Sequence, residues 1–266
     1  MKIIISGASG RMGKELIKKA LNSNNFTVVG ATERPESEFL NKDIGELIGI
    51  QNTGIKISSD ILHLTKEADA IIDFTNPLTS IENSIVAAQT RLVHVIGSTG
   101  FTNDQQEKIV LSAMHAKIVQ SGNMSLGVNL LSELTRRTAQ TLNTDFDIEI
   151  LEMHHKKKID APSGTALLLG KSAARGREID FDKNAVYNRN NITGEREDNS
   201  IGFATLRGGS VVGQHDVIFS GEGETIKLSH AVSDRGIFAQ GALTAALWAK
   251  NKKPGLYSMI DVLDLK

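Results

Sequence analysis

The side chains best suited to chemistry gather in one segment, EMHHKKKIDAPSGTA, residues 152–166. Two histidines, His154 and His155, come before three lysines. An imidazole exchanges protons near neutral pH, while lysines carry a fixed positive charge. The proline and serine that follow are typical of a helix start, where the N–H groups of Gly164 and Thr165 would be available to bind an anion. The segment therefore predicts acid–base chemistry on an anionic substrate.

Two other interpretations of these residues remain open. The lysines could form a solvated loop after a strand that ends in the two histidines, with no role in catalysis. The histidines could also be a zinc pair, but adjacent residues of a strand point to opposite faces and no third ligand is near in the sequence. We therefore expect no metal site.

A second chemical pattern lies in KIIISGASGRMGKELIKKAL, residues 2–21, which predicts a strand, a glycine turn and an amphipathic helix. The glycines at positions 7, 10 and 13 would let the backbone approach a ligand closely, and the helix start would stabilise a pyrophosphate. An ordinary glycine-bearing turn between a strand and a helix is the alternative.

The next predicted strand, residues 26–31, leads to Glu33 and Arg34. A dinucleotide-binding unit places its ribose-binding group at about this distance from the glycines. Glu33 could accept hydrogen bonds from the ribose hydroxyls of NADH, and Arg34 could pair with the 2′-phosphate of NADPH. In isolation the two residues could be a solvated pair in a loop. Together with the glycine turn they favour a cofactor site that accepts both NADH and NADPH.

The elements that would position these residues begin as an alternation of strands and helices. Strand patterns occur in ADAIIDFT (68–75), RLVHVIGSTG (91–100) and AKIVQSGN (116–123), with the helical patterns SIENSIVAAQT and NDQQEKIVLSAMH between them. This alternation predicts an α/β fold with a Rossmann-like doubly wound parallel sheet, whose ligands lie at the carboxyl ends of the strands.

The pattern changes after a predicted helix at 125–142. The strand patterns DIEILEMHH, IGFATLRGG, HDVIFSGEG and ETIKLSHAV predict a second α+β domain with an antiparallel or mixed sheet. The polar stretch 175–200 is predicted to be an exposed loop or lid with weak structure. We expect a dinucleotide-binding domain at 1–125 plus 235–266 and a substrate-binding and oligomerisation domain at 126–234.

Composition limits the classes of function. The chain has 266 residues, a formal net charge of -1 and no cysteine. This charge provides no field for nucleic acid or an anionic membrane, and the absence of cysteine excludes disulfides and thiolate metal sites. No segment approaches the ~18 apolar residues of a membrane span. We expect a cytoplasmic protein that binds neither nucleic acid nor membrane.

Several motifs together resemble the 4-hydroxy-tetrahydrodipicolinate reductase family, also called dihydrodipicolinate reductases, over nearly the whole chain. They are GASGRMG, the Glu33-Arg34 pair, DFTNP, GSTGF, EMHHKKKIDAPSGTA, IGFATLRGG, VVGQHDVIF and ALWAKNKKPGLYSMIDVLDL. The resemblance implies a cytoplasmic homotetramer of the diaminopimelate route to lysine, which reduces a cyclic dicarboxylate with NADH or NADPH.

The same resemblance implies roles for individual residues. His154 would be a proton donor or acceptor and Lys158 the proton donor. The implied substrate-binding residues are His155, Gly164 and Thr165. The implied cofactor-binding residues are Gly7, Ala8, Ser9, Gly10, Arg11, Met12, Glu33, Arg34, Gly97, Ser98, Thr99, Ser121, Gly122, Asn123 and Met124. At Ser98 and Met124 this chain departs from the Thr and Phe of the family.

Two other functions remain alternatives. A different two-domain dehydrogenase, acting on an amino acid or a sugar, would share the first 125 residues but would not need HHKKK before DAPSGT. A non-catalytic NADH-sensing protein would need a partner surface, and the sequence contains no basic recognition helix.

Overall fold

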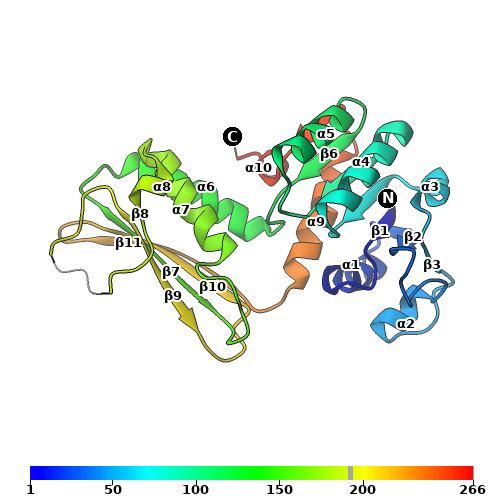
Figure 1. The fold of residues 1–266 in the computed structure, drawn as a ribbon, viewed down its shortest axis with the longest axis horizontal. Coiled ribbons are helices and arrows are strands. Elements are labelled where there is room, and N and C mark those ends of the chain that lie inside the picture. The colour runs from blue at the N-terminus through cyan, green and yellow to red at the C-terminus, as the bar shows by residue number, and fades with distance from the viewer. Residues whose placement is uncertain (191–193, 266) are drawn as a thin grey trace. The chain divides into compact units, whose positions relative to one another are not determined.

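The computed structural model describes residues 1–190 and 194–265 (Figure 1). They form two compact units. Unit 1 comprises Met1–Leu126 and the chain from Gly236 onward, and unit 2 comprises Gly127–Arg235. Unit 1 is therefore discontinuous in the sequence, while unit 2 is a single stretch.

Unit 1 is built on a parallel sheet to which the described residues contribute seven strands, in the order β12-β6-β5-β4-β1-β2-β3. The order β3-β2-β1-β4-β5-β6 is that of a Rossmann sheet, with its switch point between β1 and β4. The strands are β1 (Lys2–Ser6), β2 (Thr27–Thr32), β3 (Ile57–Ser58), β4 (Ala70–Asp73), β5 (Val93–Ile96), β6 (Lys117–Gln120) and β12 (Gly255–Tyr257).

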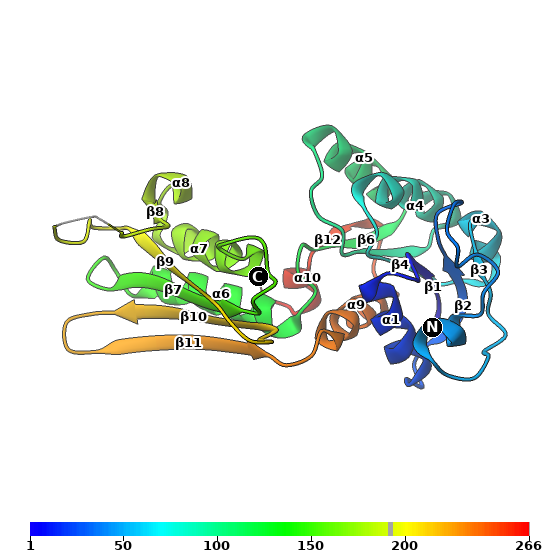
Figure 2. The same ribbon diagram turned by 60° about the horizontal axis from the view of Figure 1, so that its bottom comes forward.

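Both faces of this sheet are apolar, because each strand is a short run of buried residues. Ile3 and Ile5 point into a core shared with α1 (Arg11–Leu21) and α9 (Gly236–Ala249). Between them Ile4 points to the opposite core, where α4 (Pro77–Thr90) and α5 (Asn103–Ala113) pack. Figure 2 shows these helices around the sheet, with α9 next to α1.

Short elements complete unit 1 in places where the sequence analysis assigned none. Elements this short give no clear periodicity, and two of them begin instead at side chains that cap them. Asp43 accepts the N–H of Gly45, and Asp60 accepts the N–H of Leu62. The elements are α2 (Ile44–Ile48), α3 (Ile61–Leu64), the 3-10 helix η1 (Thr65–Glu67) and α10 (Met259–Val262).

Unit 2 contains a mixed sheet of five strands within the described residues, in the order β11-β10-β7-β9-β8. Strand β7 is antiparallel to β10 and parallel to β9. The strands are β7 (Asp147–His154), β8 (Ala185–Val186), β9 (Ile201–Arg207), β10 (Gly213–Ser220) and β11 (Thr225–Val232). The predicted fold class, a Rossmann-like sheet with a second α+β domain on a mixed sheet, is confirmed.

Two helices cover one face of the mixed sheet. Residues of α6 (Leu126–Thr141) and α7 (Gly164–Arg177) join Ile150, Val217 and Phe219 in one core. The alternation of buried and more exposed residues along β7 follows from this one-sided packing.

The prediction of weak structure at 175–200 is wrong for its first part. Helix α7 continues to Arg177, and α8 (Phe181–Asn184) and β8 follow it. Aromatic contacts explain why this part is structured, since the rings of Phe181 and Tyr187 lie 6.1 and 5.2 Å from the ring of Phe203. The predicted loop also includes residues 191–193, which lie outside the described residues.

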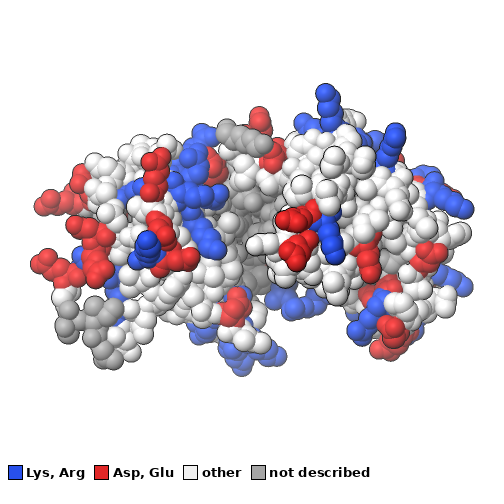
Figure 3. All heavy atoms as spheres, turned by 45° about the horizontal axis from the view of Figure 1, so that its top comes forward, with Lys and Arg blue, Asp and Glu red and all other residues white. Residues whose placement is uncertain are grey.

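Surface composition agrees with the near-neutral net charge. In Figure 3 lysines and arginines are interspersed with aspartates and glutamates on the visible faces of the units. Among the described residues, no helix combines the length and the apolar composition needed to cross a membrane.

Candidate active site

The predicted glycine turn joins β1 to α1 in unit 1 and depends on backbone geometry that only glycine allows. Gly7 has a φ of 77°, and a Cβ on Gly13 would lie within 2.2 Å of the carbonyl oxygen of Gly7. Gly10 is the N-cap of α1 and provides no side-chain hydrogen bond to the first turn. The helix therefore begins with backbone N–H groups that a ligand can satisfy.

A groove of about 600 Å³ lies beside this turn. Its wall comes from segments that follow β1, β2 and β4, which are the carboxyl ends around the switch point of the sheet. Of the predicted cofactor-binding residues, the groove is lined by Gly7, Ser9, Gly10, Glu33 and Arg34. A dinucleotide fits these residues, because the groove combines an uncapped helix start with a carboxylate and a guanidinium.

Glu33 is oriented by the glycine turn. The backbone N–H and the hydroxyl of Ser9 both donate to Oε1 of Glu33, at 2.8 and 2.6 Å. This contact directs the carboxylate of Glu33 toward the start of α1, and Arg34 follows directly in the chain.

The remaining predicted cofactor residues lie in other settings. A Cβ on Gly97 would lie within 2.3 Å of the ring of Phe74, so the glycine makes room for that ring in the groove wall. The hydroxyl of Ser98 hydrogen-bonds that of Ser80 at 2.9 Å. The side chains of Ala8 and Met124 are buried in the core of unit 1. Contact of these two residues with a ligand would be through the backbone.

The other predicted positions lie at the start of α1 and after the carboxyl ends of β5 and β6. Arg11 and Met12 form the first turn of α1. Thr99 lies near Gly122, whose Cβ would be 3.5 Å from the Thr99 methyl group. The loop after β6 is held by its own side chains, because the hydroxyl of Ser121 donates to the carbonyl of Asn123 at 2.8 Å.

A buried polar network under the groove had not been predicted. Asp73 is fully buried, and its carboxylate accepts hydrogen bonds from the Asn83 amide at 2.9 Å and the Thr75 hydroxyl at 2.6 Å. His94 Nε2 lies 3.4 Å from Oδ2 of Asp73. Burial raises the pKa of Asp73, but the contacts with His94, Thr75 and Asn83 outweigh it and lower the pKa below its usual value.

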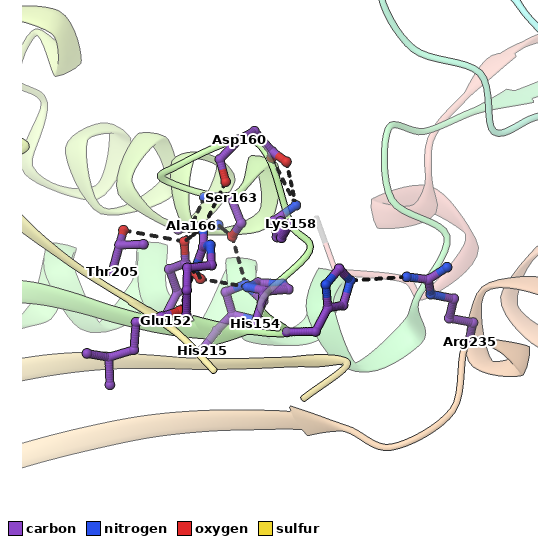
Figure 4. Close-up of polar contacts among 12 residues, drawn as sticks. Glu152, His154, Lys158, Asp160, Ser163, Ala166, Thr205, His215 and Arg235 are labelled. Carbon is purple, nitrogen blue, oxygen red and sulfur yellow. Dashed lines mark hydrogen bonds and ion pairs between the residues drawn. The ribbon is translucent and has the colours of Figure 1, made fainter. Parts of the chain in front are cut away.

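In unit 2 the candidate catalytic residues lie at the end of β7 (Figure 4). His154 is 8% exposed, and its Nδ1 lies 2.6 Å from Oε2 of Glu152, which is 1% exposed. Burial lowers the pKa of His154, and this effect outweighs the opposing effect of Glu152. The imidazole is therefore mainly neutral at neutral pH.

Arg207, from β9, completes this cluster. It forms two parallel hydrogen bonds of 2.8 Å to the oxygens of Glu152 and donates to the carbonyl of Asp160 at 2.7 Å. Burial raises the pKa of Glu152, but hydrogen bonds from Arg207 and His154 lower it more, so the carboxyl is ionised.

Lys158 is distinguished from its two neighbours by an ion pair. Its ammonium lies 2.8 and 2.9 Å from the two oxygens of Asp160, and its side chain is only 20% exposed. Lys156 and Lys157 are exposed. Of the three lysines, Lys158 is therefore the one whose side chain is held in place, as a functional residue requires.

The predicted helix start after these lysines is present. Ser163 is the N-cap of α7 and accepts the N–H of Ala166 at 3.1 Å, as the sequence predicted. Its hydroxyl also contacts Nε2 of His215 at 2.9 Å. A Cβ on Gly164 would meet no atom within 4 Å, so this end of the helix is accessible to a ligand.

His155 directly follows β7 in the chain. Its Nε2 is 3.5 Å from a guanidinium nitrogen of Arg235. In the described part of the chain, no group of three or more His, Cys, Asp or Glu residues could hold a metal ion.

The sequence analysis missed three residues of the cluster: Glu152, Arg207 and His215. Glu152 has a detectable signal, because it precedes His154 by two residues and a strand places such residues on one face. The other two depend on strand pairing. Arg207 of β9 lies opposite His154 of β7, and His215 of β10 lies opposite Glu152 of β7.

Comparison with known proteins gives consistent matches. The family model described as dihydrodipicolinate reductase, N-terminus, matches residues 1–124, and the model of its C-terminus matches residues 127–263. Proteins named 4-hydroxy-tetrahydrodipicolinate reductase from Brucella abortus (strain 2308) and Rhizobium rhizogenes are 56% and 54% identical over 266 residues. The matches cover 100% of this chain and 99% and 97% of the relatives.

A solved structure has a similar fold. It is described as dipicolinate-bound dihydrodipicolinate reductase from Paenisporosarcina sp. TG-14, with a TM-score of 0.79, 23% sequence identity and 98% coverage of both chains.

Proposed function

The chain belongs to the dihydrodipicolinate reductase family, and from this we propose that it reduces 4-hydroxy-tetrahydrodipicolinate to tetrahydrodipicolinate with a reduced pyridine nucleotide. The reaction serves diaminopimelate and lysine biosynthesis. Conversion of this substrate removes the 4-hydroxyl as water and adds one hydride and one proton. The observation that carries the proposal is the cluster of His154, Glu152, Lys158 and the α7 start in one small region of unit 2.

The groove of unit 1 is the proposed cofactor site. A nicotinamide cofactor bound there supplies the hydride. The start of α1 would hold its pyrophosphate, and Glu33 and Arg34 would contact its adenosine ribose. Because a carboxylate suits a free 2′-hydroxyl and a guanidinium suits a 2′-phosphate, we propose that both NADH and NADPH are used.

The residues of unit 2 would hold the substrate and manage its proton. The accessible start of α7 at Gly164 and Thr165 and the cationic Lys158 would bind carboxylates of the substrate, with His155 as a further contact. Charge develops on the ring as hydride arrives, and a positioned acid must supply a proton. Lys158 carries such a proton, and His154 can accept or return one at the same site.

We also propose a cytoplasmic homotetramer that associates through unit 2. The face of the mixed sheet opposite to α6 and α7 carries Leu151, Met153, Leu206 and Ile218, and Leu206 is 48% exposed. Apolar side chains on an open sheet face favour association with another copy. The proposed location is the one that the family resemblance implies.

An enzyme assay tests the reductase proposal. The unstable cyclic substrate is generated in the cuvette by the synthase that precedes it in the route, and cofactor oxidation is followed by absorbance with NADH and with NADPH. We expect oxidation that depends on the synthase. Oxidation only with an amino acid or sugar substrate would favour another dehydrogenase. Cofactor binding without any oxidation would favour an NADH sensor.

A further inference from the structure

One buried charge in unit 2 joins several parts of the candidate active site. Glu152 lies on β7 and is 1% exposed. Its Oε2 contacts His154 Nδ1 at 2.6 Å and accepts from Arg207 at 2.8 Å. Its Oε1 accepts from Arg207 at 2.8 Å and from the backbone N–H of Ser163 at 3.0 Å. One carboxylate therefore joins the candidate proton-transfer residue, the start of α7 and strand β9.

The contact with Glu152 decides where the proton of His154 lies. An ionised carboxylate can only accept hydrogen bonds, so the imidazole nitrogen 2.6 Å from it must donate. A neutral imidazole carries one proton, which is then on Nδ1 and leaves Nε2 as an acceptor. Gly213 of β10 leaves space at that atom, since a Cβ there would lie only 3.1 Å from Nε2.

We propose that Glu152, held by Arg207, is a positioning residue that keeps the proton of neutral His154 on Nδ1 and presents Nε2 as the proton-accepting atom. The inference rests on the proposed function for its catalytic meaning, while the tautomer itself is a property of the protein alone. It also assigns the order of events at the imidazole. His154 can donate through Nε2 only after it has gained a proton there, whereas Lys158 already carries one to give.

The variant Glu152→Gln would reverse the tautomer for a specific reason. At the Oε1 position the new side chain faces three donors, from Ser163, Arg207 and the Thr205 hydroxyl at 3.4 Å. At the Oε2 position it faces only Arg207 and His154. The amide nitrogen is a donor and avoids the position with more donors. It would therefore face Nδ1, which must then accept, so that the proton moves to Nε2.

The first experiment is ¹⁵N NMR of the full-length protein labelled only at its 7 histidines, without substrate or cofactor. The His154 signal is assigned by its loss in His154→Gln. We expect the Nδ1–H tautomer in the unsubstituted protein and the Nε2–H tautomer in Glu152→Gln. A matched control is Glu149→Gln, on the same strand and also paired with arginines, Arg189 and Arg196, which should leave the His154 signal unchanged.

The second experiment separates positioning from a structural role. We expect Glu152→Gln to reduce kcat by about 10²-fold or more with a smaller change in KM, because a wrong tautomer disables proton transfer without removing substrate contacts. The acidic limb of the rate profile should move to lower pH, because the variant loses the carboxylate that raises the pKa of His154. The positive charges of Lys158 and Arg207, and of His215 when protonated, disfavour the imidazolium and remain. In Glu152→Gln/Arg207→Gln the arginine that has lost its carboxylate partner is also removed. Stability should recover while kcat stays low.

Three results would overturn the proposal. They are an Nε2–H tautomer in the unsubstituted protein, an unchanged tautomer in Glu152→Gln, and recovery of kcat in the double variant. The first measurement needs no variant at Glu152, so it decides the matter even if that variant does not fold. Because NMR uses no substrate, a failure of the reductase assay would refute the proposed function and leave the tautomer result to stand or fall separately.

Discussion

His154 and Lys158 differ from the residues around them in what holds their side chains. His154 is buried against Glu152, and Lys158 is held by Asp160, whereas Lys156 and Lys157 are exposed. Replacement of His154 or Lys158 by Ala should reduce kcat by about 10² to 10⁴, which is the usual effect of losing a positioned acid or base. Cofactor affinity should stay near that of the unsubstituted enzyme.

Steady-state kinetics of the four single Ala variants test this prediction. At least one of Lys156 and Lys157 should tolerate Ala, because consecutive residues at the exit of a strand cannot all point at one ligand. Small and equal effects at all four positions would mean that the segment is a solvated loop and that the active site lies elsewhere.

The ribose end of the groove should determine cofactor preference. Glu33 to Ala removes the charge that repels a 2′-phosphate and should shift kcat/KM toward NADPH. Arg34 to Ala removes the cation that attracts it and should shift kcat/KM toward NADH. The ratio of kcat/KM for the two cofactors is the measurement, and an unchanged ratio in both variants would refute contact with the ribose. Ser9, which donates to Glu33 but carries no charge, provides the comparison variant Ser9→Ala.

Much of the candidate site was accessible from the sequence because its parts are consecutive. The segment from His154 to Thr165 contains a strand end, a charged loop and a helix start, and each has a local signature. Arg207 lies 55 residues after Glu152 in the chain, and only the register of β7 with β9 brings it to Glu152. Register depends on packing of the whole sheet, so no local pattern predicts this partner.

At the scale of elements, β10 and α7 are connected through a neutral histidine. His215 is buried, hydrogen-bonds the N-cap Ser163, and has its pKa lowered to about 4, chiefly by burial. Its pKa in the unfolded chain is about 6.5, so between pH 6.5 and 4 the unfolded state binds a proton that the folded state excludes. Stability should be full above pH 6.5 and should fall by about 3 kcal/mol toward pH 4 from this residue.

Urea unfolding at several pH values compares His215→Asn with the unsubstituted protein. The variant should lose less stability between pH 7 and pH 4, by about 3 kcal/mol. His115→Asn, which changes an exposed histidine, should retain the original pH dependence. Identical pH dependence in His215→Asn would show that His215 is not kept neutral by the fold.

The elements differ in how well the sequence predicts them, because only some of them carry an apolar pattern of their own. Strands such as β1 and β4 are continuous runs of buried apolar residues, and α1 has a clear apolar face. Each of these patterns can be recognised in the sequence. The short helix α8 and strand β8 are instead stabilised by aromatic contacts. The rings of Phe181 and Tyr187, within the polar stretch, contact the ring of Phe203 in β9. Such tertiary contacts override a polar composition that by itself indicates a loop.

At the scale of the whole molecule, the proposed tetramer depends on the open face of the mixed sheet. Leu206→Glu would place a charge on that face and should convert a tetramer of about four chain masses into smaller species. Leu62→Glu, at an exposed leucine of α3 in unit 1, should leave the assembly intact. Multi-angle light scattering measures the masses. A monomeric mass for the unsubstituted protein over a broad range of concentration would refute the tetramer.

The discontinuity of unit 1 has a consequence for synthesis on the ribosome. Helix α9 packs against α1, and β12 pairs with β6, yet residues 127–235 are translated between these partners. The sheet of unit 1 therefore stays incomplete while unit 2 is synthesised. The apolar face that α9 covers and the edge of β6 that β12 pairs with remain exposed, whereas unit 2 can fold as a continuous piece. A chain stalled before residue 236 would be a natural client for a chaperone, because the last segment of unit 1 does not yet exist.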